Sequence, residues 1–350
     1  MAVVEQGRVS LEPAFGRHET FAPRYGWFKK AVDGVAADPE VFNADDATLR
    51  LGVGKNMVRS IRFWAAAAHV IHVEKVGRRE QLSLTRFGET VFGEGGWDPY
   101  LELPGTLWLL HWRMFEPRCQ LPVWWFALND LTQPDFTVAG LSKLAMEAVS
   151  VVYGLKEPAE SSVKRDAECL IHTYARRTEG RVASDDALAC PFRMLGLVEQ
   201  EPGRPGTYRF RVGPKPNLPP EIVAFAAVEF SSRYTGASRS VALGRLLRDP
   251  GSPGRLFKLD EDSVISALTH VARARSSDLH FTDTAGVSAL QVHGDPHAIA
   301  LDVLNTYFAR VTGTGQRLES LRDERDLISV SEATTATRRR GARKPHAALA

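Results

Sequence analysis

Residues 54–68 place apolar and basic side chains at helical spacing. Four apolar residues recur at intervals of four, three and four and would share one helix face: Met57, Ile61, Trp64 and Ala68. Three basic residues fall on the opposite face: Lys55, Arg59 and Arg62. That face carries no carboxylate and has Asn56 at its margin. Because Arg, Lys and Asn side chains hold phosphates and read base edges in the major groove, the pattern predicts a DNA-recognition helix. The alternative is the solvated surface of a core helix.

The flanking segments predict the rest of a winged helix-turn-helix over residues 15–95. A short helix before the recognition helix begins at Asn43 or Asp45 as its N-cap. Gly52 and Gly54 supply the tight turn that follows it. The expected order is three helices and a two-stranded hairpin, over residues 26–37, 45–51 and 54–68 and then 70–75 and 81–85.

Further basic residues of this unit are predicted to contact DNA. Arg78 and Arg79 lie at the tip of the expected hairpin, in the turn at residues 77–80. The remaining predicted contacts are Arg24, Lys29, Lys30 and Arg86. Winged helices also serve protein–protein contacts, so a unit that never touches DNA stays as an alternative.

Residues 96–215 predict a helical middle domain rich in aromatic side chains. Five tryptophans occur in its first part: Trp97, Trp108, Trp112, Trp124 and Trp125. Aromatic rings can stack on unpaired bases, but here they alternate with Leu, Met and Phe, which favours helices in a core. A helix from about residue 161, a short helix at 185–194 and a hairpin at 197–200 and 207–212 follow. Their order echoes the first domain and suggests a second winged-helix-like unit.

Residues 216–312 predict an α-rich C-terminal domain with a small β component. Helices are expected at 221–233, 241–247, 261–274 and 296–311, with strands at 255–259 and 278–283. Residues 313–350 are largely polar and basic and have no apolar period, so we predict a disordered tail. The fold class is therefore α+β, mostly α, with a winged helix at the N-terminus and small β-hairpins.

The composition limits the classes of protein to which this chain can belong. Its hydrophobic content of 44% and charged content of 25% are ordinary for a globular chain, and a net charge of +2 requires any DNA-binding surface to come from local clustering. Three cysteines without a CxxC pair favour a reducing compartment. With no secretion segment and no apolar run of about 18 residues, the sequence predicts a cytoplasmic protein without membrane contact. A homodimer stays open.

The common catalytic motifs are missing from the sequence. Gly52-Val-Gly-Lys55 lacks the interval and the Ser or Thr of a phosphate-binding loop, and neither HExxH nor GxSxG occurs. His69 and His72 lie at the expected change from helix to strand, which argues against a shared metal ion.

One compact cluster of acidic residues and a histidine lies near the end of the chain. Asp278 and His280 point to one side of the expected strand, and Asp283 follows. Asp278, His280 and Asp283 are the predicted catalytic residues, with the two aspartates as ligands of a divalent ion such as Mg²⁺ or Mn²⁺ that activates water at a phosphodiester. A polar strand edge followed by a capped turn is the alternative.

Several segments in order resemble a known family. They are FAPRYGWFKK (21–30), residues 51–64, LTRFG (84–88), DALACPF (186–192), SPGRLFKL (252–259) and FTDTAG (281–286). The chain resembles the SspB family, the nickase component of bacterial single-strand DNA phosphorothioation systems. The resemblance implies DNA nicking for sulfur modification and anti-phage defence, beside a cysteine desulfurase and an ATPase-type subunit. It supplies no catalytic residues.

The sequence thus leads to a DNA-binding nickase, with a second hypothesis from another class. That rival is a non-enzymatic winged-helix regulator or targeting subunit. The missing nuclease motif favours the rival, and the resemblance favours the enzyme.

Overall fold

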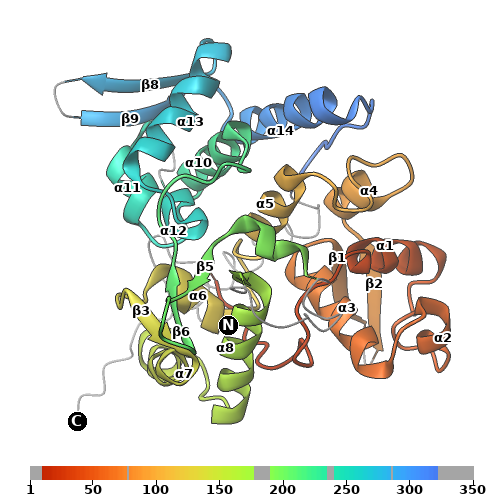
Figure 1. Cartoon of the computed structure of the whole chain (residues 1–350). Helices are drawn as coiled ribbons and strands as arrows, with labels where there is room; N and C mark the ends of the chain where they lie inside the picture. Colours follow the sequence, from red (N-terminus) through yellow and green to blue (C-terminus); the bar gives the residue numbers. More distant parts are fainter. Residues whose placement is uncertain (1–9, 77–78, 177–189, 235–239, 285–286, 322–350) are drawn as a thin grey trace, which may run out of the picture.

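The fold was analysed in a computed structural model that describes residues 10–76, 79–176, 190–234, 240–284 and 287–321. Its architecture is α+β and mostly helical, with three small sheets. Figure 1 shows the N-terminal helices at lower right, a small sheet with its helices at lower left, and the C-terminal helices above both. The predicted fold class is confirmed as α+β and mostly α with small β-hairpins.

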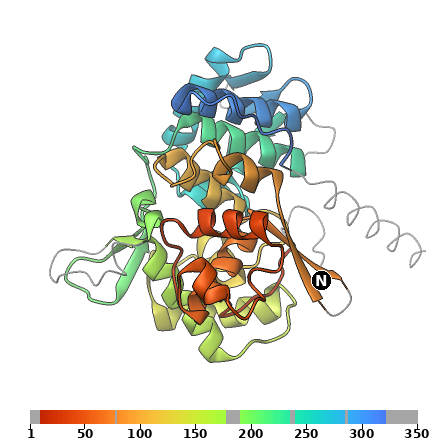
Figure 2. The same cartoon turned by 90° about the vertical axis from the view of Figure 1, so that its right-hand side faces the viewer.

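The N-terminal part contains the predicted three helices and hairpin. They are α1 (Trp27–Ala37), α2 (Ala47–Leu51), α3 (Lys55–Ala67), β1 (Ile71–Val76) and β2 (Arg79–Leu84). The strands pair antiparallel from Ile71↔Leu84 to Val76↔Arg79, and the hairpin extends from the body in Figure 2. The predicted cap of the second helix is wrong, because its N-cap is Asp46 and no side chain caps it. Assignment of these elements as a winged helix stays a prediction.

Helix α3 is buried on more than the predicted apolar face. Ile61 and Trp64 are buried as expected, but Ser60 and Phe63 are buried too. The cause is the segment 10–22, which covers a second side of the helix: the Ser60 hydroxyl donates to the His18 carbonyl at 3.0 Å. Only the strip with Lys55, Arg59 and Arg62 is left toward solvent, so the basic face is narrower than the sequence suggests.

A buried histidine–aspartate pair attaches this N-terminal segment to α8 (Glu160–Tyr174). His18 Nε2 donates to Asp166 Oδ1 at 2.8 Å, and the Gly16 amide donates to the same oxygen at 2.8 Å. The Thr20 amide donates to Nδ1 at 3.1 Å, which leaves the proton on Nε2. The His18 ring also stacks on Trp64. These contacts hold residues 10–22 against α3.

The LTRFG segment forms the start of α4 (Arg86–Phe92). Thr85 Oγ1 accepts from the Gly88 amide at 2.8 Å and donates to backbone carbonyls before β1. A Cβ at Gly88 would lie 2.1 Å from the Val70 carbonyl oxygen. Only glycine allows this close approach, which packs α4 against the entrance to the hairpin.

The tryptophan-rich block is the centre of the core, in α5 (Pro104–Arg113) and α6 (Pro122–Asn129). Trp108, Trp112 and Trp124 are fully buried. Their interpretation as core side chains rather than a base-stacking surface is confirmed. Buried apolar side chains form one continuous cluster across all three predicted domains, whose boundaries stay predictions.

A four-stranded sheet forms the lower left part of Figure 1, in the order β3-β6-β5-β4. Its strands are β3 (Asp135–Thr137), β4 (Ala175–Arg176), β5 (Val198–Gln200) and β6 (Thr207–Phe210), flanked by α7 (Val138–Glu147), η1 (Ala148–Val152), α8 and η2 (Pro191–Leu195). The β5–β6 hairpin is confirmed. The predicted strand extends too far, since β6 ends at Phe210 and Val212 is exposed. Of the predicted helix at 185–194, residues 185–189 lie outside the described chain.

The C-terminal part packs around α10 (Pro220–Tyr234), which contacts α13 and α14. The other elements are β7 (Ser240–Ala242), α11 (Leu243–Arg248), α12 (Pro253–Phe257), α13 (Glu261–Ala274), β8 (Leu279–Thr284), β9 (Val287–Val292) and α14 (Pro296–Thr312). Figure 2 shows these helices layered above α1–α3. The predicted helices at 261–274 and 296–311 are confirmed.

Two predictions for this part are wrong. The expected strand at 255–259 is helix α12, because Pro253 starts the helix and the Ser252 hydroxyl accepts from the Arg255 amide at 3.3 Å. The expected tail begins too early, because residues 313–321 are packed. Leu318 is buried there and its amide donates to Asn305 Oδ1 at 2.7 Å. Residues 322–350 lie outside the described chain.

A buried histidine in α5 gives the fold a testable pH dependence. His111 Nε2 donates to the Leu256 carbonyl at 2.9 Å, and Nδ1 accepts from the Tyr174 hydroxyl at 2.7 Å. Burial lowers the pKa of His111 from its usual 6.5 to about 4. Between these two pKa values the unfolded chain binds a proton on His111 and the folded chain does not. The contribution of His111 to the free energy of unfolding is therefore complete above pH 6.5 and declines as the pH falls toward 4.

Thermal unfolding across this pH range should therefore show a falling Tm, with a shallower slope in His111→Gln. The slope should persist in part, because burial also lowers the pKa of His69. His270 is exposed, so His270→Gln is the matched control. An identical slope in wild type and His111→Gln would contradict the assignment.

Candidate nucleic-acid interface

The exposed strip of α3 carries the predicted recognition residues. Lys55 and Asn56 are exposed in the first turn, directly after Gly54, the extended N-cap residue without a side-chain cap. Within the described residues, Lys55 has no carboxylate partner. The N-terminus of α3 thus has no side-chain cap and lies beside the positive charge of Lys55, an arrangement that attracts phosphate.

The two arginines of this strip are paired with carboxylates from other elements. Arg59 Nη1 lies 3.4 Å from Glu19 Oε1, and Arg62 forms an ion pair with Glu80 of β2. The Arg59 side chain is 56% exposed and that of Arg62 is 30% exposed. The sequence pattern contained neither partner, because Glu19 and Glu80 lie about 40 and 18 residues away from these arginines.

Several other predicted DNA contacts have structural partners. Lys29 pairs with Asp33, and Lys30 Nζ donates to the Leu51 carbonyl at 2.9 Å, at the end of α2. The Arg24 guanidinium lies 5.4 Å from the centre of the Phe21 ring. Arg86 pairs with Glu319. Their roles toward DNA stay predictions, as do those of Arg78, which lies outside the described residues, and Arg79, of whose side chain nothing is described.

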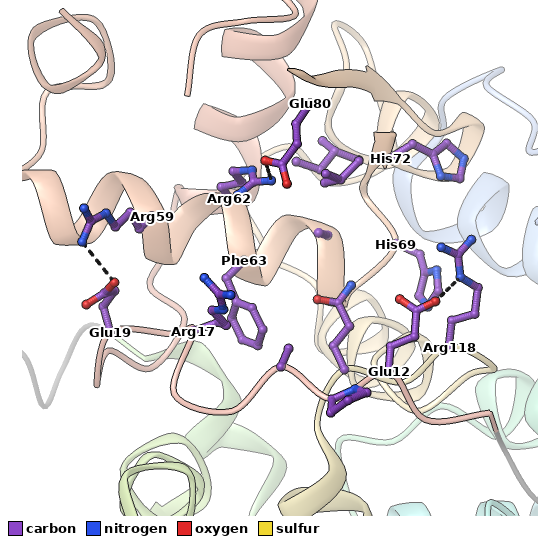
Figure 3. A pocket seen from close by; sticks show the side chains of 16 residues that line it. Glu12, Arg17, Glu19, Arg59, Arg62, Phe63, His69, His72, Glu80 and Arg118 are labelled. Atoms are coloured by element: carbon purple, nitrogen blue, oxygen red, sulfur yellow. Dashed lines mark hydrogen bonds and ion pairs between the residues drawn. The ribbon is translucent and has the colours of Figure 1, made fainter. Parts of the chain in front are cut away.

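A pocket of about 490 Å³ opens beside α3. Figure 3 shows its labelled side chains arranged around an open space, with α3 on one side and the N-terminal segment on another. Four arginines line it: Arg17, Arg59, Arg62 and Arg118. Three glutamates and two histidines join them: Glu12, Glu19, Glu80, His69 and His72. Arg118 Nε donates to Glu12 Oε1 at 2.8 Å.

The pocket combines residues that are far apart in the sequence. His69 lies in its wall at a positive φ of 53°, just after α3. Burial, and then the nearby Arg113 guanidinium, lower the pKa of His69 well below its usual value, which leaves the ring neutral near pH 7. Sequence reasoning missed Arg17, Glu12 and Arg118, since no periodicity links residues 12–19 and 118 to α3.

The predicted catalytic cluster lies elsewhere, along β8: Asp278 directly precedes the strand, and His280 and Asp283 lie within it. Asp278 Oδ2 accepts from Arg275 at 2.9 Å, and its Oδ1 accepts from the Ser277 hydroxyl at 2.8 Å. His280 is exposed and lies 5.0 Å from the His293 ring, centre to centre. Asp283 pairs with Ser288 in the strand register, and nothing is described of its side chain.

This donor set was tested for its fit to a divalent ion. Across the described ranges, no three His, Cys, Asp or Glu residues are grouped to hold a metal. The carboxylate of Asp278 is engaged by the Arg275 guanidinium, and nothing is described of the Asp283 side chain, so their role as ligands of Mg²⁺ or Mn²⁺ stays a prediction. The catalytic roles of Asp278, His280 and Asp283 stay predictions.

Comparison with known proteins identifies the family. A family model described as "Protein of unknown function (DUF4007)" matches residues 15–308. A solved structure described as "SspB crystal structure" superposes with a TM-score of 0.81 at 33% identity, over 95% of this chain and 97% of that one. The chain belongs to the SspB family. A second structure, "Magnesium ion-bound SspB crystal structure", matches at 32% identity with the same TM-score and coverage. A comparison with curated proteins finds no significant match.

The three cysteines of this SspB family member are structural. Cys119, Cys169 and Cys190 are all buried and unpaired. Burial raises the pKa of Cys119 and of Cys190 to about 12, and that of Cys169 well above its usual value. Because the thiolate is the nucleophile, none of the three is suited to accept or carry sulfur.

No helix in the described part of this SspB family member combines the length and the apolar character of a membrane span.

Proposed function

We propose that this SspB family member binds DNA through α3 and the β1–β2 hairpin and nicks it during phosphorothioate modification. The proposed setting is cytoplasmic, in anti-phage defence, beside a cysteine desulfurase and an ATPase-type subunit. The observation that carries the proposal is the exposed basic strip of α3 in a chain that matches an SspB structure over 95% of its length. A homodimer stays a prediction.

Each residue of the strip has a chemical role in this proposal. Lys55 and Arg59 neutralise backbone phosphates, and Asn56 is placed to hydrogen-bond a base edge. The pairs of Arg59 with Glu19 and Arg62 with Glu80 open when phosphates compete for the guanidinium groups. Partly exposed ion pairs such as these contribute only about 0–1 kcal/mol, so the exchange has a low cost.

A supercoiled-plasmid assay tests the nicking activity. Purified protein should convert supercoiled to open-circular DNA with Mg²⁺ or Mn²⁺, and chelation by EDTA is the control. The relative described as magnesium ion-bound supports including this cation. Binding without conversion over a range of cations would refute nicking by this chain alone.

Replacing the basic strip should weaken DNA binding without unfolding the protein. For a variant with Lys55→Ala, Arg59→Ala and Arg62→Ala, we expect at least about tenfold lower affinity for a short duplex. The salt dependence should fall by about one unit per lost phosphate contact. Fluorescence anisotropy over a salt series measures both.

The matched control is Arg248→Ala, an exposed arginine of α11 far along the chain. The free energy of unfolding, obtained from thermal melting, should change by under about 0.5 kcal/mol for each substitution at an exposed position. Unaltered DNA affinity in the triple variant would remove the recognition-helix assignment.

A second function is favoured by one observation. The predicted metal ligand Asp278 accepts from Arg275 at 2.9 Å, so its carboxylate is held in an ion pair, as expected for a non-enzymatic targeting subunit that brings a separate nuclease to DNA. In that case the basic strip of α3 still binds DNA, and the protein binds the plasmid without converting it to the open-circular form.

A further inference from the structure

The pocket beside α3 is continuous with the proposed DNA surface. Arg59 and Arg62 belong to the exposed strip of α3 and also line the pocket. A duplex held on this strip therefore has its backbone at the mouth of the pocket. At about 490 Å³, the pocket falls within the range of sites that enclose small organic ligands.

The charges around the pocket favour an anion. Four arginines face three glutamates, and the neutral His69 adds no charge. Each glutamate is paired with one arginine, in the pairs Arg59–Glu19, Arg62–Glu80 and Arg118–Glu12. Arg17 is the remaining cation: it is exposed, and within the described residues it has no carboxylate partner. In Figure 3 it lies among the pocket side chains, near Phe63.

Part of the lining is apolar. Phe63, Ile71 and Val73 contribute to it together with Ala66. A simple inorganic anion would make no use of these side chains. A nucleotide uses both features, since guanidinium groups bind its phosphate and apolar or aromatic side chains cover its base.

We propose that this pocket holds a single unpaired nucleotide of the DNA bound on α3. Arg17 and Arg59 bind its phosphate, and its base lies beside Phe63. Leaving the base stack costs least for a nucleotide that is already unpaired, so the pocket selects such a nucleotide. This inference rests on the proposed DNA-binding function.

Two duplexes and one free nucleotide test the proposal. One duplex is fully paired, and the other carries a single unpaired 2-aminopurine deoxynucleotide whose fluorescence reports its stacking. The free ligand is 2′-deoxyadenosine 5′-monophosphate, measured by calorimetry. Wild type should bind the duplex with the unpaired nucleotide about tenfold more tightly than the paired duplex, as expected for one added charge-assisted contact.

Two variants with opposite expected effects identify the pocket. Arg17→Ala should remove the preference for the unpaired nucleotide, so that the ratio of the two duplex affinities falls from about ten to about one. Glu19→Gln should increase the preference, because it frees Arg59. The matched controls are Arg248→Ala and Glu168→Gln, two exposed residues away from the pocket, which should change nothing.

The outcomes separate this inference from the proposed function. Equal affinity of wild type for the two duplexes overturns the pocket and leaves duplex binding on α3 intact. If neither duplex binds, the proposed function fails, and the free nucleotide then decides about the pocket. If wild type binds the monophosphate and Arg17→Ala does not, the pocket assignment is supported. If wild type does not bind the monophosphate, the pocket assignment is overturned.

Discussion

Replacing Glu116 with glutamine should lower the free energy of unfolding by about 3–5 kcal/mol. Glu116 is 8% exposed at its side chain and pairs with Arg113 and, at 3.2 Å, with Arg233 of α10. Both arginines also lie against rings, Arg113 over Phe87 and Arg233 over Trp112. Glutamine keeps the shape but removes the charge, so the buried Arg113 loses its carboxylate partner and Arg233 keeps only its longer contact with Glu229.

The same network joins parts of the chain that are far apart. Arg233 also lies 3.8 Å from Glu229, which accepts from His297 at 3.1 Å. Loss of the Glu116 charge should therefore loosen the C-terminal helices against α5. Denaturant unfolding measures the change. Glu168→Gln, at an exposed pair with Lys164, is the matched control and should stay within about 1 kcal/mol of wild type. A loss equally small for Glu116→Gln would show that this network does not hold the two parts together.

Strong periodicity made the long helices predictable. Helices α1, α3, α13 and α14 occur within about one residue of their expected bounds, because burial of one face imposes a regular apolar spacing. The hairpins were predictable from alternation beside turn residues. Strands β3 and β4 were missed because three and two residues are too short to show a period.

Short apolar segments were harder to assign to a helix or to a strand. Residues 255–257 form the end of α12 and residues 258–259 follow it, although a run such as Leu-Phe next to basic residues also fits a strand. The Ser252 cap and Pro253 decided the outcome in favour of a helix. A serine followed by proline is a usable helix-start signal, and weighting it above the apolar run would have placed this element correctly.

The candidate site was predictable only in its local part. The basic strip of α3 follows from spacing, but its carboxylate partners and Arg17 come from the segment 10–22 and from β2. The His18–Asp166 pair brings that segment to α3 across about 148 positions of sequence. Sequence periodicity describes one helix or strand at a time. It therefore cannot predict a pocket that forms through a contact between segments far apart in the sequence.

The predicted catalytic cluster yields the largest expected effect on activity. For Asp278→Asn combined with Asp283→Asn, we expect the plasmid-nicking rate to fall by about 100-fold or more, because loss of a group that acts on the reacting phosphate or its water has effects of this size. DNA affinity should stay unchanged, since α3 lies elsewhere in the fold. Rates of supercoiled-plasmid loss and anisotropy titrations measure the two properties.

The structure supplies a matched control for this test. Asp302 Oδ2 accepts from the same Arg275 guanidinium at 2.8 Å, so Asp302→Asn disturbs the same ion-pair network without removing a predicted catalytic group. Full nicking by Asp302→Asn together with loss in the aspartates of β8 would assign the chemistry to that strand. Equal loss in both would mean that the network around Arg275 is structural. Unimpaired nicking by the β8 variant would reject the cluster and direct the search to the carboxylates of the pocket beside α3, Glu12, Glu19 and Glu80.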